Sequence, residues 1–317
     1  MIRLERFTFG TAALLALLGS AGEDLGAQTP QVDPMRVTLL GTGAPPPDRD
    51  RMGPGTLVEA GPHKLLFDVG RGVTTSVREY GLVLGAVTGL FITHLHADHV
   101  IGLPDFWLAG HHRGPFGQRR SSLRVFGPEG TSRMLTGLED AYEDVRGYWR
   151  LSDEESDFGG IDFSEEGVLF REGELTVTAF RVSHSPMSGI DAYGYRVDYR
   201  GRSVVISGDT GYSENLIEHA RGTDLLVHEI FMVADDGRFD EAFLRQLEVS
   251  HTVPAAAARV FEAVRPTVAV GTHIGADNEP AATIEAAVRA DYEGRFVMGE
   301  DLMTFEVGES VRLIPKR

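Results

Sequence analysis

Hydrophobic residues along this chain are grouped in short apolar runs, which are bounded by glycine, proline and polar positions. Runs of this kind favour strands that are buried inside a sheet. An early series of strands is expected at residues 37–40, 56–60, 64–68 and 89–93, with a helix beginning after Gly70. A later series is expected at residues 175–182, 193–199, 203–207, 224–228 and 267–271.

Helical signals are clearest in the second half of the chain. Residues 254–264 and 280–290 each open with a proline, which is favoured in the first turn of a helix because the N–H it lacks has no partner there. Two β-rich halves, each followed by helices, predict an α/β fold. In this fold two sheets lie between outer helix layers, as an αββα sandwich.

The segment of residues 142–174 differs from its surroundings. It is rich in acidic residues, contains several glycines and the aromatics Tyr142, Tyr148 and Trp149, and has only weak periodicity. One interpretation is a solvated connection between the halves. The other is a cap over a functional site, with Tyr148 and Trp149 facing a substrate, because long loops in compact domains are often functional. The sequence leaves both open.

The N-terminus has the pattern of a secretory signal peptide. Arg3 and Arg6 precede an apolar run at residues 9–18, and the small residues near Ala27 are suited to cleavage. An apolar run of about ten residues is too short for a bilayer, which needs ~20. We therefore expect a signal peptide at 1–27, a linker at 28–35 and one domain at 36–317, in a periplasmic or secreted protein.

Composition and charge narrow the chemistry. The chain of 317 residues has no cysteine, so that any metal must be held by histidine and carboxylate side chains. Its formal charge is -17, and residues 1–27 contribute two arginines and three acids, so that the mature chain would keep -16. Such a surface repels phosphate backbones, and we expect neither nucleic acid nor, after signal cleavage, a membrane as partner.

The strongest candidate for chemistry follows the apolar run at residues 89–93. His94 and His96 stand two residues apart in a turn, so that both side chains can point to one metal ion. Asp98 and His99 come next, where a helix begins, and they point elsewhere, to a second metal. Four potential ligands within six residues are much denser than expected for an incidental polar loop.

Three further polar residues end apolar runs later in the chain: His184, Asp209 and His273. Each alone is a weak signal, but three strand ends that supply His, Asp and His fit a site at one edge of stacked sheets. A carboxylate can bridge two cations, which suits Asp209. Imidazole and carboxylate ligands together favour two Zn²⁺ ions per chain, with Mn²⁺ or Fe²⁺ as alternatives.

The order His-x-His-x-Asp-His, then His, Asp and His, resembles the metallo-β-lactamase superfamily. Other motifs are similar to its ribonuclease Z-like and arylsulfatase-like branch, and the resemblance covers about residues 36–306. These motifs are Leu40-Gly41-Thr42-Gly43-Ala44 with Arg51, Phe67-Asp68-Val69-Gly70, Gly194-Tyr195-Arg196, Ser207-Gly208-Asp209-Thr210, Asp224-Leu225-Leu226-Val227-His228-Glu229 and Ser250-His251-Thr252.

The resemblance implies a role for each of these residues. His94, His96 and His184 would hold one metal, while Asp98, His99 and His273 would hold the other, with Asp209 bridging the two. Asp68 would orient a ligand histidine. The metals would activate a bridging water, and Asp98 could accept its proton. His251, polarised by Glu229, would protonate the leaving group, so that Asp98, Glu229 and His251 are the expected catalytic residues.

The substrate expected from the sequence is a small anionic ester, either a phosphodiester or an aryl sulfate. A ribonuclease Z that processes the 3′ end of transfer RNA carries a long basic arm, and the sequence contains none. Its one basic cluster is His111-His112-Arg113 with Arg119-Arg120, which is either a solvated loop or a lining of the substrate entrance. Ribonuclease Z activity, β-lactamase or lactonase activity, and a non-catalytic metal-binding interaction protein remain alternatives. A homodimer is left open.

Overall fold

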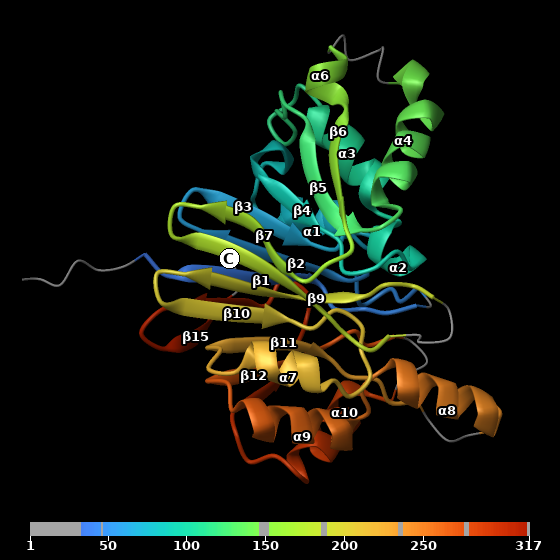
Figure 1. The fold of residues 1–317 in the computed structure, drawn as a ribbon, viewed down its shortest axis with the longest axis vertical. Helices are drawn as coiled ribbons and strands as arrows, with labels where there is room; N and C mark the ends of the chain where they lie inside the picture. Colours follow the sequence, from blue (N-terminus) through green and yellow to red (C-terminus); the bar gives the residue numbers. More distant parts are fainter. Residues whose placement is uncertain are drawn as a thin grey trace, which may run out of the picture. The chain divides into compact units, whose positions relative to one another are not determined.

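The computed structural model describes residues 33–45, 47–145, 152–184, 189–233, 237–275 and 279–315, all of which lie in one compact unit, Val32–Arg317. Its elements form two sheets with helices outside them (Figure 1). The expected signal peptide and most of the expected linker lie outside the described residues. Among the described residues, no helix has the length and apolar character needed to cross a membrane.

The first sheet contains the early strands and the end of the chain. Its strands are, in spatial order, β15 (Val311–Ile314), β14 (Thr304–Val307), β1 (Met35–Gly41), β2 (Gly55–Ala60), β3 (His63–Phe67), β4 (Gly89–Phe91), β5 (Leu123–Pro128) and β6 (Phe158–Phe163). β3 and β4 are parallel, with Phe67 opposite Phe91. This register places the residues that follow both strands, Asp68 and the turn at Thr93, side by side.

The second sheet contains the later strands. Its order is β13 (Phe296–Met298), β12 (Val268–Thr272), β11 (Leu225–Glu229), β10 (Arg202–Ile206), β9 (Tyr193–Tyr199), β8 (Leu175–Arg181) and β7 (Gly167–Glu172). β10, β11 and β12 are parallel neighbours, and Glu229 lies opposite Thr272. Parallel strands end at the same edge, so that the residues after β10, β11 and β12 meet there.

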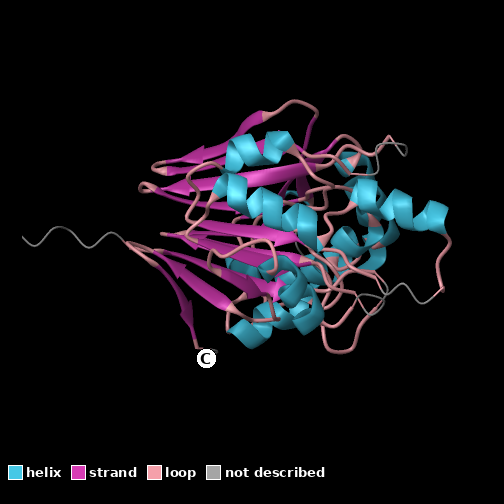
Figure 2. Cartoon of the chain, turned by 90° about the horizontal axis from the view of Figure 1, so that it is seen from below, coloured by secondary structure: helices cyan, strands magenta, loops and turns pink. Residues whose placement is uncertain are grey.

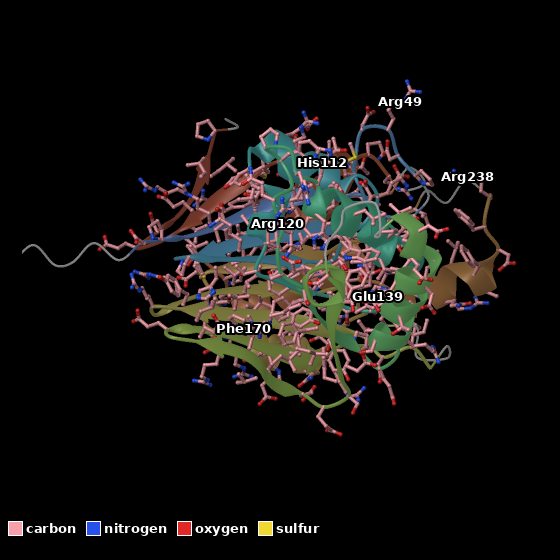
Figure 3. The ribbon with its side chains drawn as sticks, turned by 90° about the horizontal axis from the view of Figure 1, so that it is seen from above. Arg49, His112, Arg120, Glu139, Phe170 and Arg238 are labelled. Atoms are coloured by element: carbon pink, nitrogen blue, oxygen red, sulfur yellow. The ribbon has the colours of Figure 1, made fainter. Side chains whose placement is uncertain are left out.

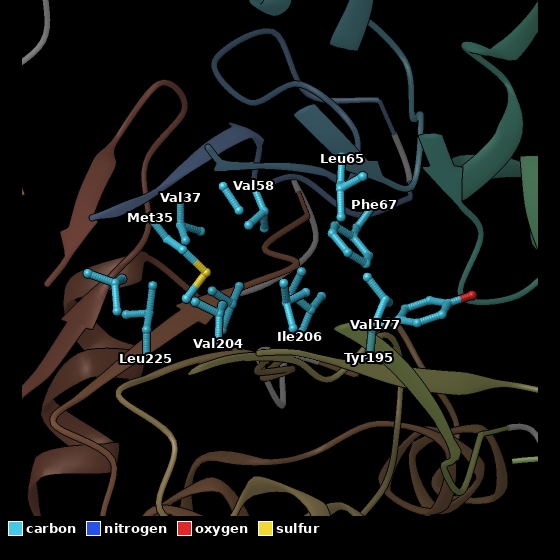
Figure 4. Close-up of a cluster of buried hydrophobic side chains, with 14 of the residues drawn as sticks. Met35, Val37, Val58, Leu65, Phe67, Val177, Tyr195, Val204, Ile206 and Leu225 are labelled. Atoms are coloured by element: carbon cyan, nitrogen blue, oxygen red, sulfur yellow. The ribbon is translucent and has the colours of Figure 1, made fainter. Parts of the chain in front are cut away.

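The two sheets pack face to face over an apolar core. Side chains of β1, β2 and β3 meet those of β8, β9, β10 and β11, as Val58, Phe67, Tyr195 and Val204 illustrate (Figure 4). All four of these side chains are at most 1% exposed. Alternate residues of these strands face this core, which is the two-residue period of a strand with one face on its partner sheet.

Helices cover the outer face of each sheet. On the first sheet these are α1 (Val73–Tyr80), the 3₁₀ turn η1 (Leu84–Ala86) and α3 (Leu103–His111), with α4 (Thr131–Ala141) beside β6. On the second sheet they are α7 (Glu214–Ala220), α9 (Pro254–Val264) and α10 (Ala281–Arg289), which lie in front of the strands in Figure 2. The predicted αββα sandwich is therefore confirmed.

The segment of residues 142–174 is more regular than its weak periodicity indicated. It includes α6 (Asp153–Ser156), β6 at the edge of the first sheet and β7 at the edge of the second. The indole N–H of Trp107 donates to the carbonyl of Ser156 at 2.7 Å and ties this segment to α3. Residues 158–172 thus connect the two sheets. Tyr148 and Trp149, the proposed cap, lie outside the described residues.

Candidate metal centre

All seven predicted ligands lie at one edge of the two sheets. The turn after β4 carries His94 and His96, and the short helix α2 (Ala97–Val100) carries Asp98 and His99. His184 follows β8, Asp209 follows β10 and His273 follows β12. The ends of four strands and one short helix therefore supply the side chains.

The first cluster consists of His94, His96 and His184. Their candidate ligand atoms lie within 4.8 Å of one another. His96 Nδ1 and His184 Nε2 are 3.0 Å apart. The rings of His96 and His184 stand nearly edge to face with that of His94, with centroids 4.6 and 4.7 Å away. Three imidazoles that converge in this way have the chemistry of one half of a zinc site.

The second cluster consists of Asp98, His99, Asp209 and His273. His99 Nε2 lies 3.3 Å from Asp98 Oδ2 and 3.3 Å from Asp209 Oδ1. His273 Nε2 lies 3.3 Å from Asp98 Oδ2 and 3.2 Å from Asp209 Oδ2. Asp209 Oδ2 is also 3.8 Å from His94 Nε2 in the first cluster. Asp209 therefore stands between the clusters, where a bridging ligand is expected.

The nitrogen atoms of the site fit a bound cation. His94 Nε2 and His99 Nε2 are buried and have no hydrogen-bond partner. Leaving a buried polar atom unpaired is unfavourable, so such atoms usually have a role that the protein alone does not fulfil. A divalent cation at each cluster would satisfy both nitrogens. The donor set fits Zn²⁺, and the assignment of the seven residues as ligands remains a prediction.

Neighbouring groups fix the orientation of the ligand rings. His99 Nδ1 donates to Asp68 Oδ2 at 2.7 Å, and His184 Nδ1 donates to the carbonyl of Ser250 at 2.7 Å. Thr93 Oγ1 donates to Asp68 Oδ2 at 2.8 Å, and it can therefore accept from His94 Nδ1 at 3.0 Å. Each of these bonds places the ring proton away from the candidate ligand atom.

The backbone at the site adopts unusual conformations. Asp68 and His273 have φ angles of 58° and 66°, in the left-handed region that most side chains avoid. Such conformations persist where the surrounding contacts enforce them, and they are common at functional sites. At Asp68 the turn directs the carboxylate back onto Thr93 and His99.

The two clusters differ in their electrostatics. Burial holds the pKa of His94 well below its usual value and lowers the pKa of His184 to about 4, so these rings are neutral. Burial would also lower the pKa of His99 and His273, but the charge of Asp209 and the other carboxylates raises both. The first cluster is thus neutral, whereas in the second the carboxylates favour the charged form of both imidazoles, and a cation that binds there would have to displace their protons.

Glu229 and His251 form a pair next to the second cluster. Glu229 is buried at the end of β11, where Oε1 accepts from the backbone N–H of Thr210 at 2.5 Å. His251 Nδ1 donates to Glu229 Oε1 and Oε2 at 3.1 and 2.9 Å. Burial would lower the pKa of His251, but the Glu229 charge outweighs it and raises the pKa to about 9. His251 is therefore protonated at neutral pH.

Comparisons with known proteins identify the family of the chain. A family model described as the beta-lactamase superfamily domain matches residues 63–274. A ribonuclease Z of Mycobacterium avium (strain 104) is 31% identical, and the alignment covers 86% of this chain and 98% of the relative.

The chain belongs to the metallo-β-lactamase superfamily.

Solved structures of the superfamily share its fold. The metallo-β-lactamase fold protein YhfI from Bacillus subtilis has a TM-score of 0.65 at 19% identity, covering 86% of this chain and 99% of that one. The short form of human tRNase Z has a TM-score of 0.61 at 24% identity, covering 85% and 98%. The expected superfamily and its ribonuclease Z-like branch are confirmed. The fold implies that this hydrolase binds divalent metal.

The basic cluster at residues 111–113 and 119–120 has a structural component. Arg119 is buried and donates to the carbonyls of Val87 at 3.1 Å and Leu84 at 3.0 Å. Arg120 donates to the carbonyls of Arg119 and His111. In Figure 3, Arg120 and His112 lie apart from Arg238, which is near α8 (Glu241–Ser250). Arg119 thus supports the loop around η1, and a role of the cluster at the substrate entrance stays a prediction.

Three contributions to the site were not predicted from the sequence. Thr93 links His94 to Asp68, the carbonyl of Ser250 orients His184, and the N–H of Thr210 holds Glu229. Two of these are backbone groups, which carry no sequence signal. His228, next to Glu229, is not part of the site: its Nδ1 donates to the carbonyl of Glu229 at 2.6 Å, and its ring packs edge-on against Phe261.

Proposed function

We propose that this hydrolase cleaves phosphodiester bonds with the help of two divalent cations, one at each cluster. The observation that carries the proposal is the convergence of seven histidine and aspartate side chains on one buried centre, in a chain that is about a third identical to a ribonuclease Z along nearly its whole length. Phosphodiester hydrolysis is common to both substrate classes, small diesters and RNA.

His94, His96 and His184 would hold one cation, and Asp98, His99 and His273 the other, with Asp209 between them. Bound there, two cations would supply an activated water at neutral pH and would neutralise charge on the phosphoryl oxygens. The Asp98 carboxylate, at the edge of the second cluster, is placed to accept a proton from the attacking water. Zn²⁺ is the proposed ion, with Mn²⁺ or Fe²⁺ as alternatives.

His251 would act on the leaving group. Its Nδ1 proton is held by Glu229, and the ring is protonated at neutral pH, so that Nε2 carries the proton that can be transferred. Protonating the departing oxygen matters most for poor leaving groups, which cannot depart as anions. Glu229 holds the imidazolium in place through its two carboxylate oxygens and does not itself contact the substrate.

Two observations bear on the size of the substrate, and they point in opposite directions. Similarity to proteins named ribonuclease Z favours an RNA 3′ end. The formal charge of -17 favours a small diester. Affinity for an RNA backbone depends on Lys and Arg side chains, which neutralise phosphates and so release the counterions bound to the RNA. We propose the small diester as the preferred substrate, with RNA as the second candidate. Aryl sulfates, lactones and β-lactams are weaker candidates.

We also propose that the chain is exported to the periplasm or secreted. The support is the pattern of residues 1–27, where two arginines precede an apolar run and small residues follow it. Export would separate the enzyme from transfer RNA precursors, which is consistent with a small diester. N-terminal sequencing of the protein recovered from its native host would test the cleavage near Ala27.

The test is a substrate panel with the protein loaded with Zn²⁺ or Mn²⁺, run at physiological ionic strength. It contains an aryl phosphodiester, precursor transfer RNA, an aryl sulfate, a lactone and a β-lactam. We expect kcat/KM to be highest for the aryl phosphodiester and any RNA cleavage to fall steeply with added salt. A His94→Ala variant controls for contaminating activity.

Efficient, site-specific trimming of the RNA 3′ end would replace the small diester by RNA and leave the phosphodiesterase proposal in place. Faster turnover of the sulfate, lactone or β-lactam than of either diester would overturn that proposal. Elemental analysis of the same preparations should find about two metals per chain, and one or none after careful reconstitution would defeat the dinuclear site.

A further inference from the structure

Phe231 lies face to face with His251. The ring centroids are 5.1 Å apart and the ring planes differ by 26°. His251 is also nearly parallel to His273, at 5.6 Å and 18°, and His273 is stacked on His99 at 5.5 Å and 29°. A series of aromatic contacts thus runs from the second cluster through His251 to Phe231, which is half-buried.

The backbone directs Phe231 toward the site. Ile230 and Met232, on either side of it, pack into the apolar layer between the second sheet and its helices. Because side chains alternate along an extended chain, Phe231 turns to the opposite side. Its backbone N–H donates to the carbonyl of Thr252 at 2.9 Å, which joins the segment after β11 to the residue after His251. The position of Phe231 relative to His251 is therefore fixed by the chain itself.

The hydrogen bonds of His251 leave one motion of its ring unconstrained. Both bonds to Glu229 are made by the same atom, Nδ1. A ring that is held at Nδ1 and by its bond to Cβ can still tilt about the line between these two points, and the tilt would swing Nε2 away from the leaving group. A flat ring packed on the face of the imidazole opposes that tilt, and small displacements of a reacting group can lower a rate by about a hundredfold.

We propose that Phe231 is a positioning residue, which holds the face of His251 so that Nε2 is directed at the leaving group. The inference rests on the proposed function, because it presupposes that His251 protonates the departing oxygen. The inference adds that a side chain without an ionisable group controls how strongly the rate depends on the leaving group.

The test uses Phe231→Ala and Phe231→Leu, assayed with methyl aryl phosphodiesters whose aryl leaving groups range from 4-nitrophenol to 4-methoxyphenol. Leucine keeps apolar bulk and lacks the flat face, so that it serves if the alanine variant does not fold. Phe231→Tyr is the conservative variant and should restore activity. Phe243→Ala is the matched control, because Phe243 is a phenylalanine on α8 that is 42% exposed and stacks on Phe239.

We expect both Phe231 variants to lose about tenfold to a hundredfold in kcat for the poorest leaving group and less than about threefold for 4-nitrophenol. Metal content should be unchanged. The double variant Phe231→Ala/His251→Ala should be no slower than His251→Ala alone, because a positioning residue has no effect once the group it positions is absent.

Equal losses for all leaving groups, or losses that add to those of His251→Ala, would overturn the inference and assign Phe231 to packing or to direct substrate contact. The proposed function fails in a different way: His251→Ala itself would then show no dependence on the leaving group. The two failures are therefore separated by the His251→Ala series, which is measured in the same experiment.

Discussion

Replacing Asp68 by asparagine perturbs the second cluster without changing its shape. The Asp68 carboxylate accepts three hydrogen bonds, from His99 Nδ1 at 2.7 Å and from the N–H and hydroxyl of Thr93 at 2.8 Å each. An asparagine has the same outline and tolerates the left-handed backbone at this position. Its amide group, however, presents an N–H where the carboxylate presents an acceptor.

The consequence for His99 follows from its two nitrogens. Facing an N–H donor, Nδ1 of a neutral His99 must become an acceptor, and the ring proton then moves to Nε2. That atom is the one that lies 3.3 Å from both Asp98 and Asp209 and would bind the cation. Disturbing the partner of a ligand histidine typically costs tenfold to a hundredfold in metal affinity, or about 1.4 to 2.8 kcal/mol.

The measurement is metal content after equilibrium dialysis against graded free Zn²⁺, for the wild-type chain, Asp68→Asn and Thr93→Val. We expect Asp68→Asn to weaken the binding step of the second cluster by the stated factor. The His94–His96–His184 step should weaken less, because Asp68 reaches His94 only indirectly, through the hydroxyl of Thr93. Thr93→Val keeps the bond between Asp68 and His99 but removes the partner of His94 Nδ1, so its loss should fall on the His94–His96–His184 step. Equal weakening of both steps, or no weakening of either, would refute the reasoning.

Three other outcomes are expected. His251→Ala and Glu229→Ala should keep both metals but lose roughly two to four orders of magnitude in turnover of poor leaving groups, and a loss of metal in either variant would contradict the assignment. On acidification, metal should leave in two steps that elemental analysis can resolve. The raised pKa of His99 and His273 means that each proton competes with the cation already near neutral pH, whereas His184, with a pKa lowered to about 4, stays neutral until far lower pH. In the His96→Ala variant only the release step at lower pH should be missing. If the step at higher pH were missing instead, the assignment of the two steps to the two clusters would be reversed. Asp162 accepts from the hydroxyl and the N–H of Ser132 and from the N–H of Gly130, at the start of α4. Partial burial would raise the pKa of this carboxyl, but these bonds outweigh it and lower the pKa. A carboxyl whose folded pKa is lowered stabilises the fold above its unfolded value of about 3.9 and loses that effect as pH falls through the folded value. Asp162→Asn should therefore lower the free energy of unfolding by about 1 kcal/mol at pH 7 and by almost nothing below the folded pKa, and a difference that did not vary with pH in chemical denaturation would contradict this account.

Much of the centre could be predicted because its ligands end buried strands. The apolar runs before Asp209 and His273 belong to parallel strands of the second sheet, and parallel strands end at a common edge. The run before His94 is a strand of the first sheet, parallel to the strand before Asp68, so that these two residues also end at a common edge. The contact between His96 and His184, 88 positions apart, depends on how the first sheet packs on the second, which the sequence pattern does not specify.

Among the elements that sequence reasoning missed, β6, β7 and α8 have little burial, whereas β5 is largely buried. β6 contains Gly159 and Gly160 and has no fully buried residue, and β7 buries little more than Phe170. Such edge strands lack the alternation of apolar and polar residues that marks a half-buried strand. α8 has a single buried residue, Ser250, so its pattern did not indicate a helix that packs on a core. Its importance to the site lies in a backbone carbonyl, which every residue type possesses.

The end of α8 has a consequence for how the two parts of the site are coupled. The carbonyl of Ser250 orients His184 in the first cluster, and the next residue, His251, is the proposed proton donor. The N–H of His251 donates to the carbonyl of Leu247 in the last turn of the helix at 2.7 Å. A shift of this last turn would therefore move a metal ligand and the proton donor together. Other elements position the second-cluster residues Asp98, His99 and Asp209. Such a shift would therefore move His251 away from the second cluster, while His251 and the ring of His184 moved together. The last turn of α8 therefore links the orientation of a metal ligand to that of the proposed proton donor.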